Sequence, residues 1–172
     1  MVGAISYVAL LRAVNVGGTG KLPMADLRKL AGQLGFGDVR TYIASGNLLI
    51  TSGLTEAQVK KQLEAALRDY AGREIGVIVR TAAEMRAVEL ANPFKSAAYN
   101  RIGVLFLDHR LPRENIRKAK GRKNEEIEIG KREIYVHYPD GMGRSKLNLP
   151  AAKYGTTRNL NTVSKLADMA GG

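Results

Sequence analysis

In the first half of the chain, apolar runs that predict strands alternate with apolar stripes that predict helices. Residues 7–14 form an apolar run interrupted by Arg12, which is typical of a strand buried on both faces. The expected strands cover residues 7–14, 39–44, 48–51 and 76–80, and the expected helices cover 24–34, 55–70 and 81–90. The order β-α-β-β-α-β, followed by a helix, predicts a ferredoxin-like subdomain over residues 1–94.

Local signals support these boundaries. Thr55 with Gln58, and Thr81 with Glu84, each have the spacing of a capping box at the start of a helix. Because residues 7–14 are apolar on both faces, the sheet face that lacks helices needs a cover, which the second half of the chain can supply.

The second half repeats the element order only in part. Its expected strands cover residues 101–107, 126–129 and 133–138, and its expected helices cover 112–120, 145–149 and 157–169. The sequence therefore predicts an α+β protein of two subdomains, in which residues 95–172 form a smaller βαββαα unit packed against the first.

Composition excludes several classes of protein. The 172 residues are 45% hydrophobic and 25% charged, as in folded globular proteins, and no apolar run approaches the roughly 20 residues that span a bilayer. The absence of cysteine excludes disulfides, thiolate zinc sites and cysteine nucleophiles. His109 and His137 lack the spacing of metal ligands. We expect a cytoplasmic protein with no membrane contact, no metal and no cofactor.

Charge points to an anionic partner. Lys and Arg number 27 against 16 Asp and Glu, a net charge of +11, and residues 96–172 hold 15 basic and 8 acidic residues. Such a surplus attracts polyanions, and it also keeps a protein soluble. If a polyanion binds, the second half of the chain is where it would more readily dock.

A glycine-rich loop follows the first strand. The stretch Asn15-Val16-Gly17-Gly18-Thr19-Gly20-Lys21 lies between a strand and a helix, as a phosphate-binding loop does. It fails the nucleotide-hydrolysing pattern, which needs glycine at Asn15 and serine or threonine at Leu22. Its backbone amides could still cradle an anion, or it could be a plain connector. The residues that would contact an anion are Asn15, Gly17, Gly18 and Lys21.

Two further features adjoin this loop in the predicted sheet. Ser45-Gly46-Asn47 is a hairpin turn that could also present a hydroxyl and an amide. Arg12, within an apolar strand, needs a partner: either an interdomain ion pair or a ligand.

The second half offers two candidates. Thr156-Thr157-Arg158-Asn159 precedes the last helix, where Thr157 would be the cap and free N–H groups could bind an anion, although Arg158 opposes the helix dipole. A basic run, Arg110 to Lys123, would place Arg113, Arg117 and Lys120 on one helix face suited to phosphates. Alternatively, that run is a solvated surface with Glu125, Glu126 and Glu128 as its partners.

Several of these segments together resemble a known family. Residues 7–18, 22–24, 34–36, 39–47 and 156–159 resemble the bacterial family catalogued as domain of unknown function 1697. The resemblance extends to about residue 169 and implies an α+β architecture of two subdomains, the first ferredoxin-like. It also implies a signature at residues 12–18, 45–47 and 157–159, but no established activity. Leu160 stands where the family often has tryptophan.

Our leading hypothesis is an interdomain cleft that binds a phosphate-bearing ligand, either a nucleotide or a nucleic-acid backbone. One alternative is an enzyme acting on a small anionic metabolite, for which the sequence shows no convincing acid or base. Another is a structural or protein-interaction module without ligand. The oligomeric state stays open. The residues expected to bind the ligand are Arg12, Asn15, Gly17, Gly18, Lys21, Ser45, Asn47, Thr157, Arg158 and Asn159.

Overall fold

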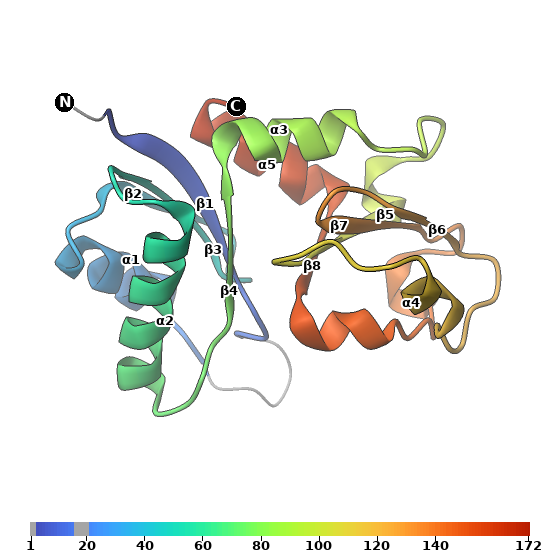
Figure 1. Cartoon of the computed structure of the whole chain (residues 1–172), viewed down its shortest axis with the longest axis horizontal. Helices are drawn as coiled ribbons and strands as arrows, with labels where there is room; N and C mark the ends of the chain where they lie inside the picture. Colours follow the sequence, from blue (N-terminus) through green and yellow to red (C-terminus); the bar gives the residue numbers. More distant parts are fainter. Residues whose placement is uncertain (1–2, 16–20) are drawn as a thin grey trace. The chain divides into compact units, whose positions relative to one another are not determined.

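The computed structural model, which describes residues 3–15 and 21–172, contains two four-stranded sheets of antiparallel strands with helices (Figure 1). The chain divides into a first unit, Met1–Met85 with Leu166–Gly172, and a second unit, Arg86–Lys165. The predicted α+β class with two subdomains is confirmed.

The first unit has the strand order of a ferredoxin-like fold. Its sheet runs β2-β3-β1-β4, so β1 and β3 lie side by side in the middle and β2 and β4 form the edges. Its elements are β1 (Ile5–Leu11), α1 (Met24–Gln33), β2 (Gly37–Tyr42), β3 (Asn47–Ser52), α2 (Glu56–Ala71), β4 (Val77–Thr81) and the start of α3 (Ala82–Leu90).

Both predicted capping boxes are present and explain where α2 and α3 begin. Thr55 Oγ1 accepts from the backbone N–H of Gln58 at 3.3 Å, and the Gln58 side chain accepts from the Thr55 N–H at 2.9 Å. Thr81 and Glu84 make the equivalent pair at 3.1 and 2.8 Å. Each box satisfies N–H groups that have no partner within the helix.

Both faces of β1 are buried, as its sequence predicts. Tyr7, Ala9 and Leu11 pack in a core with the apolar residues of α1 and α2, which lie on one face of the sheet (Figure 1). Val8 and Leu10, on the opposite face, are also fully buried. The C-terminal residues of the chain return to this unit, where the Ser6 hydroxyl donates to the carbonyl of Ala170 at 2.9 Å.

The second unit repeats the strand order of the first, because its sheet runs β6-β7-β5-β8. Its four strands are β5 (Ile102–Phe106), β6 (Glu126–Ile129), β7 (Glu133–His137) and β8 (Thr156–Asn159). Its helical segments are η1 (Tyr99–Arg101), α4 (Glu114–Arg117), η2 (Met142–Arg144), η3 (Pro150–Tyr154) and most of α5 (Leu160–Ala170).

Two details of the predicted βαββαα order are wrong. The first residues of the expected last helix form a strand instead: Thr157 pairs with Leu105 and Arg158 with Val104 on β5. The expected helix over residues 145–149 is replaced by η2 and η3 on either side of it. A threonine-rich stretch favours a strand once a neighbouring strand offers backbone hydrogen bonds, and that neighbour is invisible in the local sequence.

Gly46 gives a test of how the β2–β3 turn packs. Its φ is +85°, and a Cβ added there would lie 2.6 Å from Cγ2 of Val14 and 2.9 Å from Cβ of Leu11. Gly72, which ends α2, has a similar φ of +71° but no neighbour within 4 Å of an added Cβ.

We therefore expect Gly72→Ala to lower the free energy of unfolding by about 1 kcal/mol through backbone strain alone. Gly46→Ala adds overpacking to the same strain and should lower it by about 2–4 kcal/mol. Urea denaturation followed by circular dichroism measures both, and equal losses in the two variants would contradict the tight packing of this turn.

Candidate anion-binding site

Asn15, at the end of the first strand, is engaged with the backbone. Its Nδ2 donates to the carbonyls of Leu22 at 2.8 Å and Ala44 at 2.7 Å, and its Oδ1 accepts from the Leu22 N–H at 2.7 Å. Its φ of 56° is a conformation that asparagine tolerates better than most residues. Asn15 therefore ties together three chain segments, and its hydrogen-bonding groups are used within the protein.

The turn at residues 45–47 packs against the same strand end, as the sheet predicts. The N–H of Leu11 donates to the carbonyl of Gly46 at 2.9 Å. Asn47 is fully buried, and its Nδ2 donates to the Tyr42 carbonyl at 3.0 Å and to Ser45 Oγ at 2.9 Å. The polar groups of this turn thus hold the hairpin closed.

The two basic residues of the first unit that were predicted to bind an anion lie in different environments. Arg12 is half-buried just after β1; its N–H donates to the carbonyl of Gly76 at 2.9 Å, and its side chain packs on that glycine. Lys21 is exposed and lines a hollow of about 260 Å³ with Tyr70, Arg73 and others. Gly17 and Gly18 lie outside the described residues.

In the second unit, the three predicted residues have separate roles. Arg158 lies on β8 and is 8% exposed; its Nη1 donates to Thr156 Oγ1 at 2.7 Å and to the Thr157 carbonyl at 3.0 Å. Burial lowers the pKa of Arg158 to about 10. Asn159, and not Thr157, caps α5, because its Oδ1 accepts from the Thr162 N–H at 2.9 Å.

Thr157 is exposed, and Arg158 is not in the first turn of a helix, so the predicted conflict with the helix dipole does not arise. The structure thus brings Asn15 to the turn that holds Ser45 and Asn47, whereas the Arg12 side chain packs on Gly76. Their grouping with Thr157, Arg158 and Asn159 in one cleft stays a prediction.

The basic run of the second unit is exposed, although its predicted helix is only the single turn α4. The stripe of Arg113, Arg117 and Lys120 is therefore not formed, since Lys120 pairs through its backbone with Asn148 instead. The basic residues exposed here are Arg110, Arg113, Arg117, Lys118, Lys120, Arg122 and Lys123.

Two of the carboxylates expected to neutralise this run, Glu125 and Glu126, interact with other groups. Glu125 accepts from the Ser145 hydroxyl and from the Lys123 N–H, and Glu126 pairs with His137 Nδ1 at 2.9 Å. Within residues 3–15 and 21–172, neither forms a salt bridge with the basic run. Arg122 Nε donates to the backbone carbonyl of Glu125 at 2.8 Å, and the other exposed cations of the run are available to a ligand.

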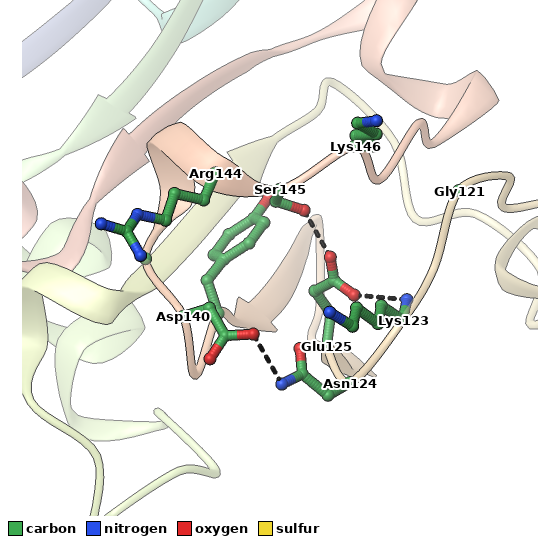
Figure 2. A pocket seen from close by; sticks show the side chains of 10 residues that line it. Gly121, Lys123, Asn124, Glu125, Asp140, Arg144, Ser145 and Lys146 are labelled. Carbon is green, nitrogen blue, oxygen red and sulfur yellow. Dashed lines mark hydrogen bonds between the residues drawn. The ribbon is translucent and has the colours of Figure 1, made fainter.

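A hollow of about 370 Å³ adjoins this run, between residues 121–125 and residues 138–146 (Figure 2). Its walls are joined by backbone hydrogen bonds of 2.9 and 2.7 Å between Lys120 and Asn148. Gly121 permits this approach, because an added Cβ would lie 2.1 Å from the Lys146 carbonyl oxygen.

Glu125 joins the two walls of the hollow. It is 5% exposed, and its carboxylate accepts from Ser145 on one wall and from the Lys123 N–H, at 2.6 Å, on the other. These hydrogen bonds, with that of Ser145 the strongest, lower the pKa of Glu125 to about 2, so it is ionised at neutral pH.

Charged and polar groups surround the hollow. Lys123 and Lys146 lie on one side of the view in Figure 2 and Arg144 on the other. Asp140 accepts from Asn124 Nδ2 at 3.0 Å. Lys123, Arg144 and Lys146 are exposed, and their side chains form no ion pair with any residue that the structure describes.

Tyr138 also lines the hollow and is half-buried. Its pKa is raised because burial removes its phenol from water and, secondarily, because the negative charge of Glu125 disfavours a phenolate. The hollow therefore combines three cations, two carboxylates and one neutral phenol.

The described part of the chain meets neither the requirements of a metal site nor those of a membrane span. No group of three or more His, Asp or Glu residues there could hold a metal ion. No helix there is long and apolar enough to cross a membrane.

Comparisons with known proteins place the chain in a family. The model of a family described as "Protein of unknown function (DUF1697)" matches residues 5–135. The chain belongs to this family. The match covers the Arg12–Asn15 and Ser45–Asn47 positions but ends before Thr157 and the C-terminal wall of the hollow.

A solved structure is similar over nearly the whole length. It is that of a conserved bacterial protein, SP0830 from Streptococcus pneumoniae, with 27% sequence identity, a TM-score of 0.80, and coverage of 98% of this chain and 99% of that one. No curated protein matches the sequence. The comparisons thus support the fold and the family and assign no activity.

Sequence reasoning missed the hollow. The basic run was singled out, but Arg144 was given no role, and Lys146 was placed in the helix expected over residues 145–149. A signal was present: glycines and basic residues recur in both 121–123 and 141–146, which is typical of loops that approach closely.

Asn15 can be tested as a structural residue. Asn15→Ala removes the partner of the Leu22 N–H and of two carbonyls, so we expect the free energy of unfolding to fall by about 1–3 kcal/mol. Lys21→Ala, at an exposed neighbour, should change it by less than about 0.5 kcal/mol. Equal stability of both variants in urea denaturation would show that Asn15 is free for a ligand.

The ionised Glu125 predicts a pH dependence. Its folded-state pKa of about 2 lies below the ordinary 4.5, so its stabilisation is complete above about pH 5 and is lost as pH falls towards 2. Glu125→Gln should lower the free energy of unfolding by about 2 kcal/mol at neutral pH, and this difference should shrink below pH 5.

Glu128→Gln is the matched control, because Glu128 is exposed on the neighbouring strand β6. It should leave the pH profile of urea denaturation unchanged. A difference between wild type and Glu125→Gln that stays constant from pH 7 to pH 2 would show that the Glu125 charge does not join the walls.

Proposed function

We propose that this protein binds a phosphate-bearing ligand, a nucleotide or a nucleic-acid backbone, through the basic loops of its second unit. The observation that carries the proposal is the exposed run from Arg110 to Lys123. Two of its three expected partners, Glu125 and Glu126, are engaged with other groups, and the third, Glu128, is exposed on β6. Cations without carboxylate partners are available to phosphates, which they bind through charge-assisted hydrogen bonds.

The distribution of charge supports the same unit. Residues 86–165 hold 17 basic and 8 acidic residues, a net +9, whereas the rest of the chain holds 10 and 8, a net +2. A concentrated surplus attracts a polyanion more strongly than the same charge spread over the surface.

The polar residues of the first unit add less to this proposal than the sequence suggested. Asn15 and Asn47 donate to backbone carbonyls of their own unit, which accounts for them without a ligand. Lys21, which is exposed, stays among the residues proposed to contact phosphate.

Binding fits the geometry better than acid–base catalysis. Glu125 lines the hollow with three cations, and its pKa of about 2 makes it a very weak base at neutral pH. A general base works best when its pKa lies near the pH at which the enzyme operates.

The salt dependence of binding to a duplex oligonucleotide tests the proposal. We expect tight binding at low salt, with the logarithm of the binding constant falling linearly as the logarithm of salt concentration rises. Lys118→Gln with Lys120→Gln should reduce that slope by about 2, because each lysine that contacts a phosphate contributes about 1.

Lys29→Gln with Lys61→Gln is the control, since it removes the same charge from exposed positions of α1 and α2. It should leave the slope unchanged. Fluorescence anisotropy measures both pairs. Equal effects of the two pairs would refute the second unit as the site, and a lack of binding by wild type at low salt would refute the nucleic-acid form of the proposal.

A further inference from the structure

We propose that the hollow between residues 121–125 and 138–146 is a site for a small phosphate monoester that carries hydroxyl groups, such as a sugar phosphate or a nucleoside monophosphate. This inference rests on the proposed function and narrows it. It assigns a small-molecule site to the hollow, which shares Lys123 with the exposed basic run that suits a polymer backbone.

The size of the hollow favours a small ligand. Its volume of about 370 Å³ lies at the lower end of the range of ligand pockets, about 300–1,000 Å³. Its walls are held by the Lys120–Asn148 backbone pair and by Glu125, so the shape exists before a ligand arrives. A preformed site loses less free energy on ordering than a flexible one.

The cations suit a phosphate group. Lys123 belongs to one wall of the hollow and Arg144 and Lys146 to the other, so a phosphate in the hollow meets cations of both walls (Figure 2). With Glu125 and Asp140 included, the lining has a net charge of +1. That small surplus fits a monoester of charge about −1.5 to −2 at neutral pH better than a polyanion.

Asp140 supplies the preference for hydroxyl groups. It is exposed, and Asn124 donates to its Oδ2 at 3.0 Å. A carboxylate has capacity for more than one donor and accepts readily from hydroxyl groups. Near a bare phosphate the same charge is repulsive, so Asp140 favours ligands in which hydroxyls accompany the phosphate.

The two carboxylates of the hollow, Glu125 and Asp140, have different roles in this inference. Glu125 is a positioning residue, because its oxygens accept from Ser145 and the Lys123 N–H and so fix the two walls. Asp140 is a residue that determines ligand specificity. The ring of Tyr138 lines the hollow between them.

Isothermal titration of the full chain with ribose 5-phosphate, adenosine 5′-monophosphate and inorganic phosphate tests the inference. The two organic monoesters should bind more tightly than inorganic phosphate. Lys123→Gln with Lys146→Gln should weaken their binding about tenfold, the effect expected when charged hydrogen-bond donors are lost. A preference between the two monoesters identifies whether the ligand is a nucleotide or a simple sugar phosphate.

Arg113→Gln with Lys118→Gln is the matched control, because it removes equal charge from exposed positions outside the hollow and leaves Lys120, whose backbone joins the walls, unchanged. It should leave monoester affinity within about twofold of wild type while weakening oligonucleotide binding. Equal weakening of monoester binding by the two pairs would overturn the inference, since only overall charge would then matter.

Asp140→Ala tests the hydroxyl preference through a ratio of two affinities, because the lost negative charge acts on the phosphate group of both probes. The ratio of ribose 5-phosphate affinity to inorganic phosphate affinity should fall by about tenfold if Asp140 accepts from hydroxyls. An unchanged ratio would overturn this role. Thermal melting of each variant confirms that it is folded.

The outcomes also separate this inference from the proposed function. Oligonucleotide binding without monoester binding would overturn the inference alone. The absence of binding to every phosphate-bearing probe at low salt would overturn both.

Discussion

In both sheets, the first strand in sequence is buried on each of its faces. Tyr7 to Leu11 on β1 and every residue of β5 are buried, so side chains of alternating direction all lack contact with water. This constraint has two consequences. Polar groups on the sheets must find partners within the protein, as Arg158 does, and the chemistry available to a ligand is left to the loops.

The loops then contain polar residues of two kinds. The first kind forms hydrogen bonds with the backbone. Asn15 closes a loop, Asn47 closes a hairpin, and Asn159 caps a helix. Lys123, Arg144 and Lys146 are exposed without such partners among the described residues. The first kind accounts for polar residues of the predicted signature without a ligand, and the second offers a ligand cations that have no ion-pair partner among the described residues.

Glu125 links the architecture of the second unit to its electrostatics. The Glu125 carboxylate lines the hollow with three cations but forms an ion pair with none of them. It accepts hydrogen bonds from the Ser145 hydroxyl and the Lys123 N–H instead. Its negative charge is therefore used to hold two basic loops at a fixed distance. That arrangement places cations of both loops along one hollow, where a bound anion would neutralise them.

The sequence by itself determined the fold class, the capping boxes and the burial of the first strand, because these follow from local periodicity and from hydrogen bonds within a few residues. Only the tertiary structure decided that Thr156–Asn159 is a strand, that Asn159 is the cap, and that residues 121–125 and 138–146 face each other. Each of these depends on groups distant in sequence: β5 for the strand, and Ser145 for Glu125. Such contacts form only when segments distant in sequence come together in the fold, and the local pattern of residues does not predict which segments meet.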